Sequence, residues 1–223
     1  MTASRPPLVQ LAGRFIRLEP LTPDHLPELH AAIAHPIVFG GGYGGGPAGL
    51  PADETAFVDW AHGYYAWGAG NVYAVVVAHG PHVDAVVGTT TISDFDLRNE
   101  SAHIGWTAYD PRVWGTAVNV EAKRLLLGMA FDHGFGRVKI QADALNERSR
   151  AAISRLGATF EGVARRDKPR ADGTWRDTAT FAVTIDDWPG VKALLEERLR
   201  AHSSHPVAFR PWPAVGPTGA VSV

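Results

Sequence analysis

The chain has 223 residues, of which 21 are Lys or Arg and 23 are Asp or Glu, so its formal net charge is −2. This balance gives no electrostatic basis for binding nucleic acid or an anionic membrane. The absence of cysteine excludes disulfides, thiolate nucleophiles and Cys-ligated metal centres. No apolar run approaches the ~18 residues of a transmembrane helix, and the first residues lack the apolar core of a signal peptide. These features predict a cytoplasmic protein.

The first part of the chain predicts a strand followed by two helices. Residues 13–21 alternate as in a strand, and residues 22–34 carry Leu26, Leu29 and Ile33 at helical spacing. A second helix is predicted over residues 53–67. Three histidines recur every five residues, which spreads them around a helix and favours solvated side chains over a metal site: His25, His30 and His35.

A glycine-rich stretch at residues 40–51 separates these helices. Gly40, Gly42 and Gly45 formally match G-x-G-x-x-G. A dinucleotide site also requires a preceding strand and a helix directly after the motif, whereas prolines interrupt the residues after the motif here. We therefore reject such a site and predict a mobile loop on the substrate side.

Three closely spaced extended segments then predict an antiparallel meander over residues 73–79, 85–93 and 101–109. Residues 110–119 form a turn that opens into an amphipathic helix ending near Gly134. Its predicted polar face carries Glu121, Lys123, Arg124 and Asp132. A strand, a short turn and a helix N-terminus together present backbone N–H groups that stabilise anions. Residues 112–119 fit that description.

The remaining elements are a strand over residues 137–143, a helix from Asn146 to Leu156 and a hairpin formed by 159–166 and 174–185. A final helix covers residues 188–201. We expect one domain over residues 1–201, followed by a disordered Pro-rich tail at 202–223.

This order of elements resembles that of the GCN5-related N-acetyltransferases (GNAT), in particular their RimJ/RimL-like branch. The resemblance covers residues 11–200 and is carried by three motifs: Gly13-Arg-Phe-Ile-Arg-Leu-Glu-Pro-Leu21, Trp114-Gly-Thr-Ala-Val-Asn-Val-Glu-Ala-Lys-Arg-Leu-Leu-Leu127 and Asn146-Glu-Arg-Ser-Arg-Ala-Ala-Ile-Ser-Arg-Leu-Gly-Ala158. It implies an α+β fold, with a mixed, mostly antiparallel sheet of about seven strands flanked by helices. Two central strands would part into a V at the cofactor site, one ending near Tyr109 and one beginning near Arg137. Family members often pair, which allows a homodimer.

The resemblance implies acetyl-coenzyme A (acetyl-CoA) as acyl donor and no metal. In the family a [QR]-x-x-G-x-[GA] turn holds the pyrophosphate through backbone amides. Arg112, Gly115 and Ala117 match this pattern, whereas alignment on the following helix puts Trp114, Ala117 and Asn119 at its fixed positions. The implied cofactor-binding residues are Arg112, Trp114, Gly115, Thr116, Ala117, Val118, Asn119 and Asn146, the last of which also caps its helix.

Catalytic roles are also carried over from the family. Many relatives protonate the leaving thiolate with a tyrosine, but the matching residue here is Ile153, and Ser149 takes the position at which RimL-like members place a serine. The glutamate that relatives often use as the base corresponds to His103, a residue type with a pKa near ~6.5. Glu100 is the alternative carboxylate, and Asp94 is a more distant one.

The expected function is acetyl transfer from acetyl-CoA to a primary amine, on a protein N-terminus or a small molecule, by direct attack in a ternary complex. No covalent acyl-enzyme is expected, because the chain has neither cysteine nor an activated-serine motif. The alternative is a catalytically silent acyl-CoA-binding protein, since the phosphate pattern, the tyrosine and the glutamate are all substituted. Four aromatic residues could line an acceptor pocket: Tyr43, Trp60, Tyr64 and Trp106.

Overall fold

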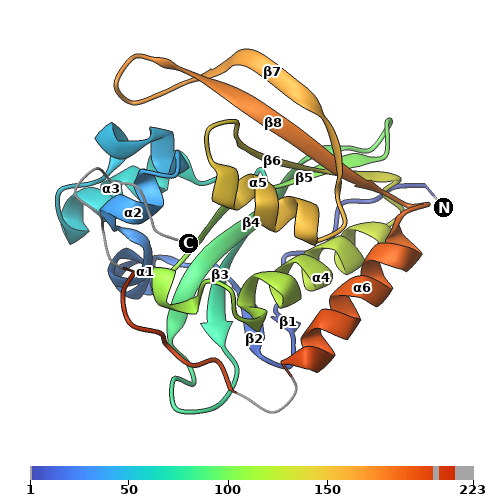
Figure 1. The fold of residues 1–223 in the computed structure, drawn as a ribbon, viewed down its shortest axis with the longest axis horizontal. Helices are drawn as coiled ribbons and strands as arrows, with labels where there is room; N and C mark the ends of the chain where they lie inside the picture. Colours follow the sequence, from blue (N-terminus) through green and yellow to red (C-terminus); the bar gives the residue numbers. More distant parts are fainter. Residues whose placement is uncertain (1, 203–205, 214–223) are drawn as a thin grey trace.

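The computed structural model describes residues 2–202 and 206–213, and its centre is one sheet of eight strands (Figure 1). The strands are β1 (Leu11–Ala12), β2 (Ile16–Pro20), β3 (Asn71–Val77), β4 (Val86–Asp96), β5 (Ser101–Tyr109), β6 (Arg137–Asp143), β7 (Thr159–Pro169) and β8 (Trp175–Thr184). Their spatial order is β1-β2-β3-β4-β5-β6-β8-β7, and only β5 and β6 pair in parallel. The predicted α+β fold with a mostly antiparallel sheet is confirmed, with the two-residue β1 as an added strand.

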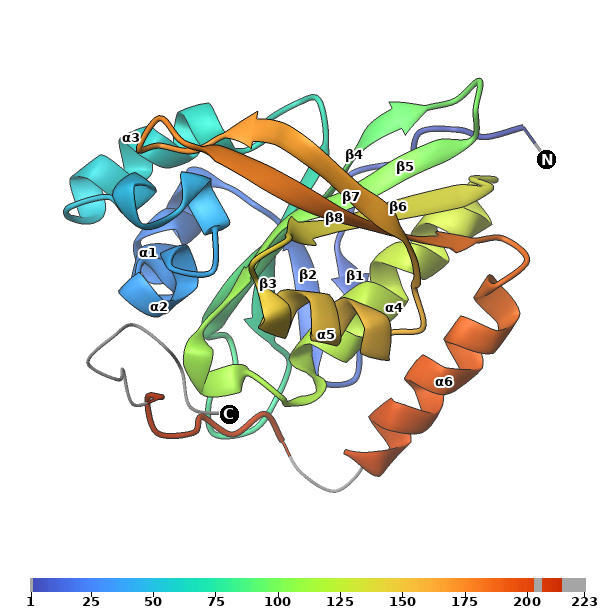
Figure 2. The same ribbon diagram turned by 45° about the horizontal axis from the view of Figure 1, so that its top comes forward.

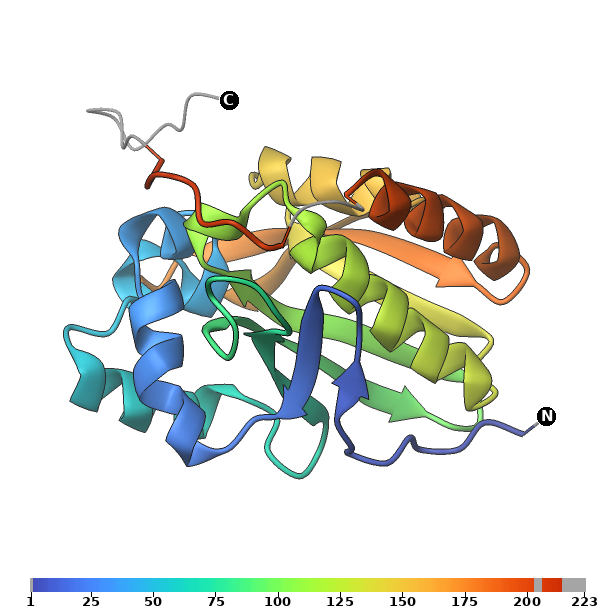
Figure 3. The same cartoon turned by 90° about the horizontal axis from the view of Figure 1, so that it is seen from below.

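Helices cover both faces of this sheet (Figures 1 and 3). One face carries α1 (Leu26–Ile33), α2 (Pro36–Phe39) and α3 (Glu54–Tyr64), and the other carries α4 (Ala117–Asp132), α5 (Glu147–Arg155) and α6 (Trp188–Ala201). Strand β3 is buried on both faces, because Val75 belongs to the core beneath α4 while Ala74 belongs to the core beneath α1. Within the described ranges, no helix is both long and apolar enough to cross a bilayer.

The parallel pairing of β5 with β6 is short. It extends from Ser101 opposite Arg137 to Ile104 opposite Ile140 and then stops, although both strands continue. Beyond this point β6 pairs only with β8, as far as Asp143 opposite Thr178. The two strands therefore diverge (Figure 2), as the predicted V requires.

The hairpin of β7 and β8 crosses over the diverging strands, and its tip approaches the glycine-rich segment near α3 (Figure 2). The amide of Ala171 at the tip donates to the carbonyl of Gly45 at 3.0 Å. The hairpin thus covers the place where β5 and β6 part.

The carboxylate of Glu121 joins α4 to the N-terminal strands. It is buried and accepts the amides of Arg14 (2.7 Å), Phe15 (2.6 Å) and Ile16 (2.8 Å). Gly13 is required beside it, because an added Cβ would lie 2.4 Å from the Glu121 carboxyl carbon. Glu121 therefore does not lie on a solvated helix face, contrary to the prediction from periodicity.

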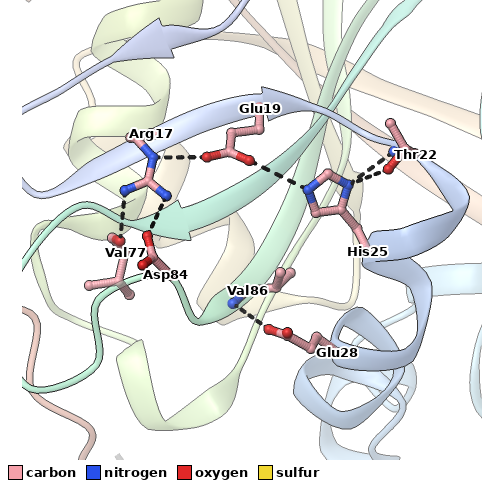
Figure 4. Close-up of polar contacts among 8 residues, drawn as sticks. All are labelled: Arg17, Glu19, Thr22, His25, Glu28, Val77, Asp84 and Val86. Carbon is pink, nitrogen blue, oxygen red and sulfur yellow. Dashed lines mark hydrogen bonds and ion pairs between the residues drawn. The ribbon is translucent and has the colours of Figure 1, made fainter.

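A second polar network ties β2 to the chain around it (Figure 4). Arg17 donates to Glu19 and to Asp84, both at 2.8 Å. The Nδ1 atom of His25 accepts the amide of Thr22 at 3.1 Å, and its Nε2 lies 3.5 Å from Glu19. The network fixes the start of α1 against the sheet.

The three N-terminal histidines are half-buried structural residues, which corrects the expectation that they are solvated. His25 caps the turn before α1, and His30 packs edge-on against Phe57 with ring centroids 5.3 Å apart. His35 stacks on Trp212 at 4.7 Å. Among the described residues, no group of three or more His, Asp or Glu side chains could hold a metal ion.

Part of the predicted tail is packed against the protein. Residues 206–213 contain no helix or strand, yet Val207 is buried and Phe209 stacks on His82 with ring centroids 4.0 Å apart. The amide of Arg210 donates to the carbonyl of Arg112 at 3.0 Å. The expectation of disorder is thus wrong for this segment, and residues 203–205 and 214–223 lie outside the described residues.

Replacing Glu121 by Gln is expected to lower the free energy of unfolding by about 3 kcal/mol, because buried amides would lose a charged acceptor. Chemical denaturation measures this change. The matched control is Glu196→Gln, whose carboxylate forms a half-exposed ion pair with Arg124 at 3.0 Å and should change stability by less than about 1 kcal/mol. Equal effects of the two substitutions would contradict the structural role of Glu121.

Candidate active site

A cavity of about 290 Å³ lies in the gap between β5 and β6, and we call it the splay cavity. Its walls are residues 104–109 of β5, residues 140–143 of β6, the turn before α4 and one side of α5 from Arg148 to Arg155. The edge of β5 that faces β6 has no strand partner from Gly105 to Tyr109. Backbone groups on this edge are therefore available to a ligand in the cavity.

The turn before α4 supplies one end of the splay cavity. Gly115 has a φ of +73°, a conformation that favours glycine, and Thr116 is the N-cap of α4. The first helical residue is Ala117. The pattern Arg112-x-x-Gly115-x-Ala117 therefore places its glycine at the turn position that needs one. The first-turn amides of α4 lack main-chain partners within the helix, although Thr116 Oγ1 accepts that of Val118, and such a helix end suits an anion.

Not all the predicted cofactor residues reach the splay cavity. Trp114, Gly115, Asn119 and Asn146 line it, whereas four others do not: Arg112, Thr116, Ala117 and Val118. Thr116 instead caps the helix, and Ala117 and Val118 are buried in the core beneath it.

The side chain of Arg112 is held away from the splay cavity. Its guanidinium pairs with the buried Asp110 at 2.6 Å. The rings of Phe209 and Trp212 flank it at 4.5 and 4.8 Å. An added Cβ on Gly115 would lie 3.2 Å from Nη1 of Arg210, so this second guanidinium stands beside the turn. The C-terminal segment thus packs against Arg112, the basic residue of the motif. The same segment places the guanidinium of Arg210 beside the turn.

Asn146 caps α5 as predicted and also holds the glycine-rich segment. Its Oδ1 accepts the amide of Ser149 at 2.9 Å, while its Nδ2 donates to the carbonyl of Gly41 at 2.5 Å. Ser149 lines the splay cavity from the first turn of α5. Next to it, the guanidinium of Arg148 lies 3.4 Å from the ring centre of Trp114, which connects α5 to the turn before α4. Burial lowers the pKa of Arg148 to about 10.

A second cavity of about 470 Å³, which we call the hairpin cavity, lies beneath the tip of the β7–β8 hairpin. It is bounded by the glycine-rich segment, by His103, Gly105 and Trp106 of β5, and by the hairpin residues Lys168, Arg170 and Arg176. The two cavities share six lining residues, which are Gly42, Tyr64, Gly105, Trp106, Gln141 and Arg176. They therefore meet where β5 and β6 part.

Aromatic side chains support this junction from beneath. Tyr43 and Tyr64 line the cavities, whereas Trp60 stacks behind Tyr64 with ring centroids 4.3 Å apart and lines neither. Trp106 has a φ of +46° in a bulged part of β5, and its indole donates to the carbonyl of Tyr64 at 3.0 Å. Bulges of this kind redirect a strand and are frequent beside active sites.

The glycine-rich segment lies over both cavities. Gly41 and Gly42 line the splay cavity, and Gly42 and Gly44 line the hairpin cavity. The segment consists of short 3₁₀ turns, and the amide of Gly44 donates to the Tyr64 hydroxyl at 3.3 Å. Together with the bonds from Asn146 and Ala171, this contact fixes the segment to three different elements.

His103 lines the hairpin cavity and pairs with Asp94. Its Nδ1 lies 3.1 Å from Oδ2 of Asp94, and its buried Nε2 has no hydrogen-bond partner among the described residues. An added Cβ on Gly105 would lie 3.0 Å from Nε2, so this nitrogen faces the junction of the cavities. Burial, together with the charges of Lys139 and Lys168, lowers the pKa of His103, although Asp94 acts in the opposite direction. The imidazole is neutral at pH 7 and able to accept a proton.

The other predicted carboxylate lies elsewhere. Glu100 is exposed in the turn between β4 and β5, its carbonyl accepts the amide of Gly136 at 2.8 Å, and it lines neither cavity. Asp94 is instead the carboxylate that contacts the histidine, and this hydrogen bond lowers the pKa of Asp94 to about 2. Asp94 and His103 are nine residues apart in the sequence, and this spacing does not predict a contact between them. The contact depends on the register of β4 against β5.

Lys123 also reaches the splay cavity, which corrects its prediction as a solvated residue. Its ammonium group is buried and donates to the hydroxyls of Thr107 at 2.7 Å and Thr90 at 3.1 Å. Burial lowers the pKa of Lys123 to about 7. Sequence periodicity could not identify it, because a charged residue on a helix is normally assigned to solvent.

Comparisons with known proteins agree with this architecture. A family model for the acetyltransferase (GNAT) domain matches residues 16–159. A GCN5-related N-acetyltransferase from Brucella melitensis is 27% identical, with a TM-score of 0.78 over 88% of this chain and 87% of its own. A T. thermophilus protein assigned as an acetyltransferase is 31% identical, with a TM-score of 0.75 over 85% of this chain and 96% of its own.

A more distant structure shows the fold alone. The Microcin C7 self-immunity acetyltransferase MccE, solved with acetyl-CoA and AMP, is 19% identical, with a TM-score of 0.62 over 78% of this chain and 94% of its own. The comparison with curated proteins gives no match.

The parted sheet, the helix N-terminus at its opening and these comparisons define an acyltransferase domain. The chain belongs to the GNAT acetyltransferase family, since the family model spans more than half of it.

Lys123→Met is expected to stabilise the protein at pH 7.5 by about 1–3 kcal/mol, because it removes a buried cation that no carboxylate neutralises. With a pKa of about 7 when folded and 10.5 when unfolded, Lys123 binds more protons in the unfolded state between these values. Wild-type stability should therefore rise from pH 7 to 10, and the variant should lose that rise. Unfolding at several pH values tests this, with the exposed Lys192→Met as control. An unchanged pH slope in Lys123→Met would contradict it.

Proposed function

We propose that this protein transfers an acetyl group from acetyl-CoA to a primary amine. The observation that carries the proposal is the meeting of two cavities at the unpaired edge of β5, one beside an anion-binding helix end and one beside a neutral histidine. Such an arrangement lets a thioester and an amine approach from opposite sides. We propose direct attack within a ternary complex, without a covalent acyl-enzyme.

The splay cavity is the proposed site of acetyl-CoA. The amides of the turn at Gly115 and of the first turn of α4 would hold the pyrophosphate, with Arg210 adding positive charge. The pantetheine arm would extend past Asn146 along the unpaired edge of β5. A backbone amide on that edge would stabilise the oxyanion as the amine attacks.

Proton movement is assigned to two side chains. As the C–N bond forms, Nε2 of His103 would accept the proton of the amine, with Asp94 holding the ring through Nδ1. As the C–S bond breaks, the hydroxyl of Ser149 would give its proton to the departing thiolate and take a proton from solvent in its place. Glu100 is omitted from this proposal because it lies outside both cavities.

A silent acyl-CoA-binding protein is the alternative function. Two features agree with it. Ile153 stands where many relatives have a tyrosine that protonates the thiolate, and the guanidinium of Arg112 is already paired with Asp110. The Asp94–His103 pair beside the cavity junction favours an enzyme, since a purely binding domain has no use for an oriented neutral imidazole. The RimJ/RimL-like branch, a homodimer and a cytoplasmic location stay predictions from the sequence.

Calorimetric titration with acetyl-CoA, followed by measurement of thiol release with a panel of amines, tests the proposed function. We expect saturable binding and amine-dependent release. Ser149→Ala should bind acetyl-CoA as the wild type does but lower kcat, because its role arises only as the thiolate leaves. Ser154→Ala, in the same helix, is the control with unchanged kcat. Binding without turnover on any amine would favour the silent protein, and absence of binding would overturn both.

His103→Ala is expected to lower kcat by about 10²-fold, the usual contribution of a positioned base. In the wild type, kcat/KM for the amine should rise through a limb below pH 6.5, because only the neutral imidazole accepts a proton and burial lowers its pKa. Asp94→Asn removes a hydrogen bond that raises this pKa, so the limb should move to still lower pH. His30→Ala serves as the matched control. A wild-type rate and pH profile of the His103→Ala variant would contradict the assignment of His103 as the base.

A further inference from the structure

The hairpin cavity has an unusual charge distribution. Three cationic side chains line it, Lys168, Arg170 and Arg176, and its lining contains no Asp or Glu. Only Arg170 is neutralised, because it pairs with the buried Asp143 at 2.7 Å. The part of the chain that the structure describes contains no ion pair from a carboxylate to Lys168 or Arg176.

The two remaining cations also stand opposite each other. Lys168 and Arg176 are cross-strand partners in the β7–β8 hairpin, an arrangement of like charges that destabilises a sheet. Lys168 is exposed and Arg176 is half-buried. Partial desolvation lowers the pKa of both groups, and the charge of Arg176 lowers that of Lys168 further. Arg176 has one side-chain partner, the hydroxyl of Thr178 at 3.1 Å from its Nε. The rest of its planar fork can bind an oxyanion.

Other charges nearby do not cancel this excess. Asp94 is bonded to His103, Asp143 is bonded to Arg170, and the exposed Asp167 does not line the cavity. Lys139 adds a further positive charge, which lowers the pKa of Lys168 and of His103. The cavity therefore offers a net positive wall within reach of the neutral imidazole.

The remaining walls limit the size and shape of an occupant. Tyr64 and Trp106 give flat apolar surfaces, and the volume of about 470 Å³ is in the range of small-molecule sites. Arg176 and Gly105 belong to both cavities. A molecule bound to Arg176 would therefore lie beside the place where the two cavities meet.

Resting on the proposed function, we infer that the acceptor is a small primary amine bearing an oxyanion, a carboxylate or a phosphoryl group, which Lys168 and Arg176 bind. The inference names a substrate class for the hairpin cavity. It assigns Lys168 and Arg176 to specificity rather than to proton transfer.

Matched amine pairs test this inference in the full chain with acetyl-CoA. The carboxylate pair is phenylalanine and 2-phenylethylamine, and the phosphoryl pair is O-phosphoethanolamine and ethanolamine. With rates compared per unprotonated amine, the anionic member of at least one pair should have a kcat/KM about 10- to 100-fold higher. The pair with the larger ratio identifies the anion. Equal rates, or faster neutral amines, would overturn the inference while leaving acetyl transfer intact.

Variants locate the preference. The double substitution Lys168→Gln and Arg176→Gln should remove it, mainly through the KM of the anionic amine. Its Tm should stay equal or rise, because a like-charge pair is removed, whereas a structural role would lower Tm. Arg165→Gln, an exposed residue of β7 that lines neither cavity, should keep the full preference. A preference that survives the double substitution would overturn the inference.

Two further readouts separate the inference from the proposed function. Calorimetry with acetyl-CoA alone tests the proposed function. Absence of binding would contradict the proposed function before any amine is added. If acetyl-CoA binds but no pair is turned over, N-acetylphenylalanine and N-acetyl-2-phenylethylamine, with N-acetyl-O-phosphoethanolamine and N-acetylethanolamine, are titrated into the CoA-loaded protein. Tighter binding of an anionic member would support the inference, and no difference in either pair would reject it.

Discussion

The early end of the parallel pairing between β5 and β6 determines how the rest of the molecule is arranged. Four residue pairs hold the strands together, and past Ile104 each strand follows a different neighbour. β5 stays with β4, whereas β6 stays with β8. Because a buried strand edge must be satisfied, the opening needs an occupant or a cover. The start of α4, the first turn of α5 and the β7–β8 hairpin surround it.

The charges around this opening differ from one side to the other. The splay cavity ends at a helix N-terminus, where backbone dipoles attract an anion without a basic side chain. The hairpin cavity has free cations and a neutral imidazole. Lys123 lines the splay cavity as a buried cation and donates to the hydroxyls of Thr90 and Thr107. The gap in one sheet thus joins two environments that suit different chemical groups.

Local patterns predicted much of this arrangement. Alternation and capping signals predicted β5 and β6 with their observed bounds, and Asn146 was recognised as a cap, because each depends on neighbours in sequence. The family motifs led to Gly115, Ser149 and His103. The misassigned residues depend on long-range contacts instead. The buried carboxylate of Glu121 accepts amides that lie more than a hundred positions away in the sequence. The contact between Asp94 and His103 depends on a bulge in the pairing of β4 with β5. The segment at 206–213 has a composition typical of disorder, but aromatic stacking on His82 and His35 holds it.

The hydrogen bonds between Glu121 and the amides of residues 14–16 also determine when the N-terminal strands can be completed during synthesis. The N-terminal strands emerge first, but their carboxylate acceptor is 105 to 107 residues further along the chain. Until α4 has left the ribosome, those amides have only water as partner. The same holds at the other end of the sheet. Strand β7 is translated before β8, but it can join β6 only through β8, which lies between them. Both outer parts of this sheet are therefore completed by chain that is translated after them, and folding that closes such long loops is slow.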